Sequence, residues 1–210
     1  GFESAIKGVR RSIVAVGAVA AGFAAGLFTL AKNVSNVGDE IAKSSQELGL
    51  STDAFQEWRY AASQAGISQD ELATSVRMFS RNIGNAVTSG TGPFVERMQQ
   101  LGVSLTDASG KLKTNDDLLL EVADALTKVK DASVRGAIAQ EFFGRSGLRM
   151  ATFLSAGSQE MKLLRQRARD LGLVLDNDTI KSAEEFNDRL EEVGDVIKAV
   201  KNQVGAALIP

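Results

Sequence analysis

The sequence contains neither cysteine nor histidine, and these two absences exclude several classes of function at once. Without cysteine there is no disulfide scaffold, no thiol nucleophile and no thiolate ligand for a metal. Without histidine the chain lacks the commonest general base and the commonest metal ligand, so Ser-His-Asp hydrolysis and histidine-ligated zinc are excluded as well. Pro93 is the one internal proline, and aromatic residues make up 6% of the chain. Few prolines favour long helices, and sparse aromatics disfavour a stacking platform for nucleic-acid bases.

The charge of the chain is nearly balanced, with 24 basic and 26 acidic residues among 210. This balance provides no electrostatic attraction for nucleic acid. Acidic pairs such as Asp70-Glu71 are adjacent in sequence, so on a helix the two carboxylates point in different directions and do not form an acid–base pair. The Gly-rich stretch 89–93 lacks the Lys-Ser/Thr of a phosphate-binding loop. We therefore predict that the protein is not an enzyme and that it has no cofactor and no metal site.

An uncharged, apolar run of 20 residues, Ser12–Ala31, lies between basic residues near the start of the sequence. Twenty helical residues span about 30 Å, which is the thickness of the hydrocarbon core of a bilayer. Ala18, Gly22 and Gly26 form a row of small residues that would let two such helices approach closely. We predict a basic-flanked, membrane-competent helix within residues 1–35. A helix buried in protein is one alternative, because alanine and glycine are only mildly apolar. A signal peptide is a weaker one, because the run is long for the apolar part of such a peptide.

Two amphipathic stripes between Ser51 and Val87 predict a helical hairpin whose turn is Ala65–Ser68. Ser68–Glu71 has the sequence of a capping box, and Asp53–Gln56 is a similar helix start. We expect the two apolar faces to bury each other. A DNA-reading helix-turn-helix is the less favoured alternative, because the second helix carries few basic residues. The two stripes recur at helical spacing, at Phe55, Trp58, Ala62 and Ala65, and at Leu72, Val76, Phe79, Ile83 and Val87.

The remaining helix-start and helix-end signals in the sequence predict an all-α fold of elongated helices and helical hairpins. Leu-Gly pairs at 48–49, 101–102 and 171–172 are typical of helix ends where glycine adopts a left-handed conformation. Residues 103–113 predict one small β-hairpin. Polar capping residues predict helix starts at 114–116 and 131–133, and a further helix at 147–154. Residues 36–175 form a helical region in this interpretation.

The last segment, residues 176–210, carries a strict heptad pattern that predicts a coiled coil. Both core positions are mostly β-branched, with Ile197 and Val204 at one and Val193 and Val200 at the other, which favours three or more strands over two. An amphipathic helix on a globular core is the alternative. The predicted seam alternates steps of three and four residues: Ala183, Phe186, Leu190, Val193, Ile197, Val200, Val204 and Ala207.

Two blocks of this sequence resemble the N-terminal conserved region of the tail tape measure proteins of tailed phages. The first is residues 39–68, DEIAKSSQELGLSTDAFQEWRYAASQAGIS. The second combines residues 101–113, LGVSLTDASGKLK, the helix that follows, and residues 139–147, AQEFFGRSG. The resemblance spans residues 36–175, and the apolar Ala/Gly-rich segment upstream is also usual for that family. The chain is short for the family and does not begin with Met.

The resemblance implies a structural protein of a phage, prophage or gene-transfer particle. Such a protein sets the length of the tail tube during assembly and fills the tube lumen. It leaves during infection to help the genome cross the host envelope. The implied partners are further copies of the chain in a homotrimer, the tail tube protein, tail tip or baseplate proteins, and tail assembly chaperones. The implied locations are the virion tail lumen and, transiently, the host inner membrane, without sequence-specific nucleic acid.

Two other functions are compatible with parts of the sequence. A single-span membrane protein with a soluble helical coiled-coil domain, acting as a sensor or adaptor, accounts for Ser12–Ala31 and the heptads but not for the two blocks. A wall-degrading domain, which some tape measure proteins carry, lacks supporting residues here. Cell fractionation separates the first alternative from a tape measure protein, because a permanent membrane protein stays in membranes.

Overall fold

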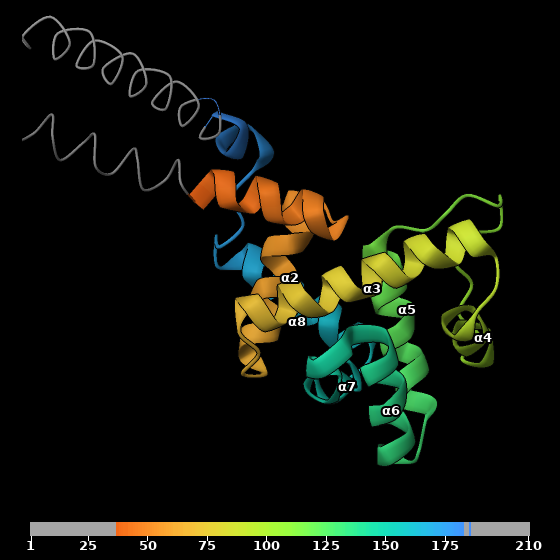
Figure 1. Cartoon of the computed structure of the whole chain (residues 1–210). Coiled ribbons are helices and arrows are strands. Elements are labelled where there is room, and N and C mark those ends of the chain that lie inside the picture. The colour runs from red at the N-terminus through yellow and green to blue at the C-terminus, as the bar shows by residue number, and fades with distance from the viewer. Residues whose placement is uncertain (1–36, 183–184, 186–210) are drawn as a thin grey trace, which may run out of the picture. The chain divides into compact units, whose positions relative to one another are not determined.

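The computed structural model describes residues 37–182 and Glu185. Residues Ile41–Asp178 form one compact unit, and the other described residues belong to a second unit. Every regular element in the described part of the chain is helical, so the all-α prediction is confirmed (Figure 1). The predicted coiled-coil seam from Ala183 to Ala207 lies outside the described residues, and so does the small-residue row Ala18, Gly22 and Gly26. Among the helices that are described, none is long and apolar enough to cross a membrane.

The compact unit contains seven α-helices whose bounds the structure defines, and one 3₁₀ turn (Figure 1). Residues 37–48 and 177–182 are also helical. The predicted short helix at 147–154 and the predicted helix starts near residues 115 and 132 are confirmed. The elements are α2 (Thr52–Gln64), α3 (Gln69–Ser89), α4 (Pro93–Gln100), α5 (Asn115–Lys128), α6 (Ala132–Phe143), η1 (Gly144–Ser146), α7 (Gly147–Leu154) and α8 (Ser158–Asp170).

The helix ends follow the Leu-Gly pairs of the sequence. Gly49, Gly102 and Gly172 have φ values of 62°, 71° and 68°, which is the left-handed region that glycine adopts without steric cost. After each glycine the next N–H turns back to a carbonyl of the preceding helix, as from Leu50 to Ser45 at 3.0 Å. This is the hydrogen-bond pattern of a Schellman motif. The predicted helix ends are therefore confirmed at all three positions.

The predicted mutual burial of the α2 and α3 faces is wrong in its main point. The two helices touch, but α2 packs chiefly against α8, and α3 packs chiefly against α6. Buried residues of α2 run consecutively from Ala54 to Trp58, so more than one side of this helix needs a partner. The stripes also end early, since Ala65 is exposed and Val87 is 55% exposed. The later helices α8 and α6 cover the apolar faces of α2 and α3.

An aromatic cluster forms the centre of the packing between α3, α4 and α6. The Phe79 and Phe143 rings lie 5.2 Å apart, and the Phe94 and Phe142 rings lie 4.9 Å apart, measured between centroids. Phe79, Phe142 and Phe143 are almost completely buried. Buried aromatic pairs add stability beyond the area that they remove from water. The cluster therefore joins segments that are more than 60 residues apart in sequence.

A close backbone approach shapes the turn between α6 and α7. A Cβ atom at Gly147 would lie 2.4 Å from the Cα of Gln140 and 2.5 Å from the carbonyl oxygen of Ala139. No side chain fits at that separation, so glycine is required for α7 to lie against α6. The AQEFFGRSG block therefore has a structural reason for its last glycine.

Residues 103–113 form a single antiparallel bridge between Thr106 and Leu112, where a small β-hairpin is predicted. The N–H of Asp107 donates to the carbonyl of Lys111 at 2.8 Å. The Asp107 carboxylate also accepts the N–H groups of Ser109 and Lys111, at 2.8 and 3.0 Å. Hydrogen bonds from Ser109 and Lys111 lower the pKa of Asp107, because they stabilise its charged form.

Candidate functional site

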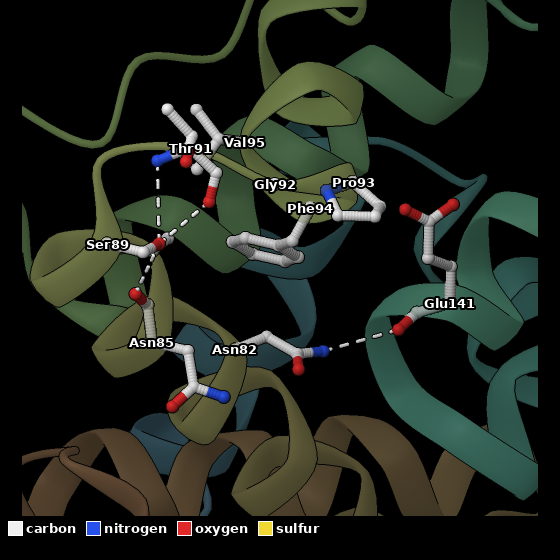
Figure 2. A pocket seen from close by; sticks show the side chains of 10 residues that line it. Asn82, Asn85, Ser89, Thr91, Gly92, Pro93, Phe94, Val95 and Glu141 are labelled. Atoms are coloured by element: carbon white, nitrogen blue, oxygen red, sulfur yellow. Dashed lines mark hydrogen bonds between the residues drawn. The ribbon is translucent and has the colours of Figure 1, made fainter.

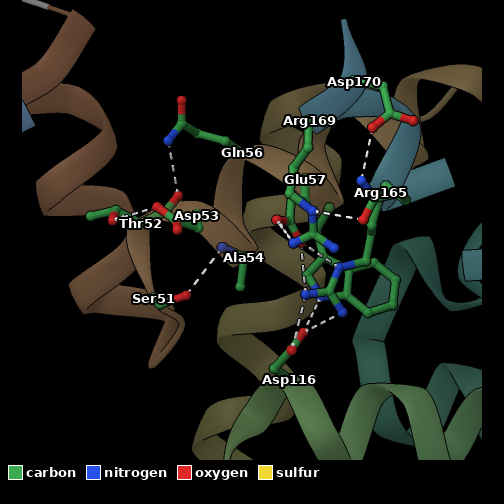
Figure 3. A network of polar contacts seen from close by, with 12 residues as sticks. Ser51, Thr52, Asp53, Ala54, Gln56, Glu57, Asp116, Arg165, Arg169 and Asp170 are labelled. Atoms are coloured by element: carbon green, nitrogen blue, oxygen red, sulfur yellow. Dashed lines mark hydrogen bonds and ion pairs between the residues drawn. The ribbon is translucent and has the colours of Figure 1, made fainter. Parts of the chain in front are cut away.

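A buried ion cluster connects α2 to α8 within the compact unit (Figure 3). Glu57 on α2 is 1% exposed and Arg165 on α8 is 8% exposed. The Nε of Arg165 donates to Oε2 of Glu57 at 2.9 Å, across 108 residues of sequence. Arg169, one helical turn further along, pairs with the other oxygen of Glu57. The buried carboxylate is thus neutralised on both oxygens by the same helix.

The same guanidinium reaches α5 and lies against the one tryptophan of the chain. Arg165 donates to Asp116 at 3.0 Å, and its Cζ lies 5.1 Å from the Trp58 ring centroid. The indole Nε1 of Trp58 donates to the same Asp116 at 2.6 Å. Trp58 also meets Phe153 of α7 edge-on, with ring centroids 6.1 Å apart. Four helices therefore converge on Arg165 and Trp58.

A second polar contact joins α2 to the chain that follows α8. The side-chain amide of Gln56, which is 3% exposed, accepts the N–H of Leu175 at 2.8 Å and donates to the carbonyl of Leu175 at 3.0 Å. The predicted capping role of Asp53–Gln56 is wrong, because Ser51 caps α2 by accepting the N–H of Ala54. The buried amide of Gln56 thus pairs with both the backbone N–H and the backbone carbonyl of Leu175. These two hydrogen bonds hold the segment after α8 against α2.

The ion cluster is a positioning device for helices. Its two carboxylates, Glu57 and Asp116, face two guanidinium groups, Arg165 and Arg169, and the charges balance within the cluster. Buried ion pairs of this kind keep their charges only with close partners and good hydrogen bonds. The cluster therefore links α8 to α2 through Glu57 and to α5 through Asp116.

The local sequence does not identify Glu57 and Arg165 as cluster residues, and it predicts only a helix start at Asp116. The signal for Arg165 was its register, because Met161, Arg165 and Ala168 share the buried face of α8. An arginine at a core-facing position requires a buried acceptor. The position of that acceptor, 108 residues earlier, has no local signature in the sequence.

A pocket of about 270 Å³ with a mixed polar and apolar lining lies where the end of α3 meets α4 and α6 (Figure 2). The Gly-rich stretch 89–93 lies along one side of it. Asn82 joins α3 to α6 by donating to the carbonyls of Glu141 and Phe142, each at 3.2 Å. The residues that line this pocket are Asn82, Asn85, Ala86, Ser89, Thr91, Gly92, Pro93, Phe94, Val95 and Glu141.

A second pocket of about 370 Å³ lies between the bridge segment, α5 and the start of α8. Asp124 of α5 accepts the N–H of Ser158 at 2.7 Å, and so caps α8 from a different helix. This hydrogen bond lowers the pKa of Asp124, because it stabilises the carboxylate. Among the described residues, no group of three or more acidic side chains is arranged to hold a metal ion.

Comparison with known proteins gives one family. The model of a family described as phage-related minor tail protein matches residues 11–144. The match takes in the whole apolar run and the compact unit as far as the end of α6. No curated protein and no solved structure gives a significant match.

Proposed function

The chain belongs to the family of phage-related minor tail proteins, and from this membership we propose that it is a tail tape measure protein. Membership of the family itself means a structural role in the phage tail and association with the virion. The proposal is finer: the protein sets the length of the tail tube during assembly, fills the tube lumen, and leaves during infection to help the genome through the host envelope. It acts without catalysis.

The observation that carries the proposal is the extent of the family match. It starts at residue 11, directly before the apolar run, and covers the first block that resembles tape measure proteins and the second block as far as residue 144. The apolar run and the tail-protein region are thus parts of one matched sequence. A sensor or adaptor accounts for the apolar segment and the heptads, but not for the two blocks.

We propose that the measuring function belongs to a segment whose helical length grows with its residue number. A straight α-helix rises about 1.5 Å per residue, so its length reports residue number directly. The compact unit instead folds back on itself, and Glu57 pairs with Arg165 after 108 intervening steps along the chain. We assign the ruler to the heptad segment from Ala183 to Ala207, in a bundle of three copies. The tail tube protein, tip or baseplate proteins and assembly chaperones are the proposed partners.

Deletion of whole heptads between Ala183 and Ala207 tests the ruler. Each deleted heptad is expected to shorten the tail by about 10 Å, because seven helical residues are lost from the measured length. Electron micrographs of negatively stained particles give the length distribution. Lys198→Ala, which keeps the residue count, is the control and leaves the length unchanged. Tails of unchanged length after two deleted heptads contradict the ruler role of this segment.

The apolar segment is proposed to enter the host inner membrane during ejection. Val19→Arg adds a charge near the middle of the segment, which costs about 2.5–3.5 kcal/mol at the centre of a bilayer. Particles that carry this variant are expected to assemble tails of normal length and adsorb normally, yet deliver DNA poorly. Val19→Leu is the matched control.

Normal DNA delivery by Val19→Arg particles contradicts the membrane role. Fractionation distinguishes the alternative protein class: a single-span sensor or adaptor stays in the membrane fraction in cells that make no particles. A tape measure protein instead purifies with the particles.

A further inference from the structure

The helix α8 contributes little apolar surface to the compact unit. Its buried residues are Ser158, Met161, Arg165 and Ala168, and two of these four are apolar. The helix α5, of similar length, buries six apolar side chains. Even over the ring of Trp58, α8 places the guanidinium of Arg165, 5.1 Å from the centroid. Because apolar burial is the main source of stability in a folded unit, α8 is joined to the others more weakly than they are joined to one another.

The polar contacts of α8 and of residues 171–178, which together we call the strap, follow one another along the chain. Every partner in these contacts lies on α2 or α5 (Figure 3). In order from the far end of the strap, the contacts are Asn177 with Thr52, Leu175 with Gln56, Arg169 and Arg165 with Glu57, Arg165 with Asp116, and Ser158 with Asp124.

Separation of the whole strap differs from the loss of one charged partner. When Arg165 and Glu57 move apart, water hydrates both of them, and this hydration offsets much of the attraction that the buried pair loses. A substitution at Arg165 leaves Glu57 buried, so no such compensation occurs. The ion cluster therefore fixes the position of the strap without adding much to the free energy that holds it there.

We propose that the strap separates from α2 and α5 as one unit while the other helices keep their packing. The aromatic cluster joins α3, α4 and α6 without any residue of the strap. The helix α2 stays attached through Trp58, which meets the Phe153 ring of α7 and donates to Asp116 of α5. An isolated helix of 13 residues is marginal in water, so α8 loses its helical hydrogen bonds once it has separated.

Separation lets the chain after residue 178 move away from a unit that stays folded. A pull on that chain loads the contacts one after another, from Asn177 back to Ser158, and successive contacts yield to a smaller force than contacts that must break together. This use of the strap rests on the tape measure role proposed above. The separation itself is a property of the compact unit and is tested without reference to tails.

Native-state hydrogen exchange on the 210-residue chain measures the separation. The protected amides of α8 are expected to share one protection factor, at least about thirtyfold lower than those of α5 and α6, because they exchange through a partial opening. Their exchange is also expected to depend less steeply on urea, since this opening exposes less surface than complete unfolding.

Variants outside the strap show whether the opening is separate. Gly147→Ala, whose Cβ meets backbone atoms of α6, is expected to lower the protection of α5 and α6 about tenfold. The protection of α8 stays unchanged, because the variant raises the free energies of the closed and separated states equally. Ile138→Val, a milder change at a buried position of α6, gives the same pattern with a factor of about three.

A variant at the strap contact gives a different pattern. Gln56→Leu removes both hydrogen bonds to Leu175 and is expected to lower the protection of α8 about tenfold. The amides of α5 and α6 fall by the same factor, because both openings start from the same closed state. Gln64→Leu, the same substitution at an exposed position of α2, is the control and leaves all three helices unchanged.

Three results overturn the proposal. The first is a loss of protection in α8 that equals the loss in α5 when Gly147 or Ile138 is replaced, because the unit then opens only as a whole. The second is protection that declines residue by residue toward the end of α8, which is fraying. The third is unchanged protection of α8 in Gln56→Leu. The heptad deletion experiment measures tail length and decides the tape measure role separately.

Discussion

Replacement of Arg165 by methionine is expected to destabilise the compact unit strongly. Methionine keeps much of the apolar stem but removes the guanidinium that contacts Glu57, Asp116 and the Trp58 ring. Glu57 then stays 1% exposed with the half-exposed Arg169 as its remaining ionic partner. Loss of one partner from a buried ion pair costs about 3–5 kcal/mol, because the other charge is left incompletely compensated.

The loss in the free energy of unfolding distinguishes an arginine in a buried ion cluster from an arginine in an exposed ion pair. Arg77→Met is the matched control: Arg77 pairs with Glu47 at 2.8 Å, but the two side chains are 56% and 58% exposed. An exposed pair contributes about 0–1 kcal/mol, since water and salt screen it. The same substitution at two ion pairs of similar distance therefore differs by at least about 2 kcal/mol in the free energy of unfolding.

Chemical denaturation of the full chain measures the effect. Trp58 is the single tryptophan and lies in the cluster, so its fluorescence follows the unfolding of this unit directly. Urea titrations give the free energy of unfolding by linear extrapolation. The melting temperature of Arg165→Met is expected to fall by roughly 10 °C, at about 2–4 °C per kcal/mol for a chain of this size.

A double variant tests whether the cost comes from the stranded charge. Arg165→Met combined with Glu57→Leu removes both charges, and a buried ion pair replaced by apolar groups is often close to neutral in stability. The double variant is expected to recover at least about 2 kcal/mol relative to Arg165→Met. A stranded buried charge is excluded as the cause if Arg165→Met costs no more than Arg77→Met. It is also excluded if the separate effects of Arg165→Met and Glu57→Leu simply add in the double variant.

Two further predictions concern the close backbone approach at Gly147 and the capping of α8 by Asp124. Gly147→Ala is expected to lower stability by about 1–3 kcal/mol, because its Cβ meets backbone atoms at 2.4–2.5 Å, whereas Gly84→Ala, with nothing within 4 Å, raises it by about 0.5–1 kcal/mol. Thermal denaturation compares these two variants, and equal effects would exclude the close approach. Asp124→Asn keeps an acceptor for Ser158 but cannot titrate. The lowered pKa of Asp124 means that its stabilising contribution is present above the unfolded-state pKa and is lost as pH falls through the folded-state pKa. The difference between wild type and Asp124→Asn, about 0.5 kcal/mol at neutral pH, should therefore close below about pH 4. A difference that does not change with pH would contradict this origin.

Local features of the fold were predictable from the sequence because their causes lie within a few residues. A left-handed glycine after leucine ends a helix wherever it occurs, as at Gly49 and Gly102. The same holds for helix starts, since the hydroxyl of Thr114 accepts the N–H of Asp117, three residues away. The absence of cysteine and histidine likewise limits the chemistry of the chain without reference to any fold.

Only the tertiary structure decided which helices bury each other and which charges meet. The apolar stripe of α2 predicts that this helix is buried, but a stripe does not identify its partner, and α8 covers it in preference to α3. Glu57 looks like a surface acid until Arg165 and Arg169 are placed beside it. The pocket beside Glu141 likewise exists only because α3, α4 and α6 converge. Contacts between helices a hundred residues apart depend on how all the helices pack together. No local pattern in the sequence specifies that packing.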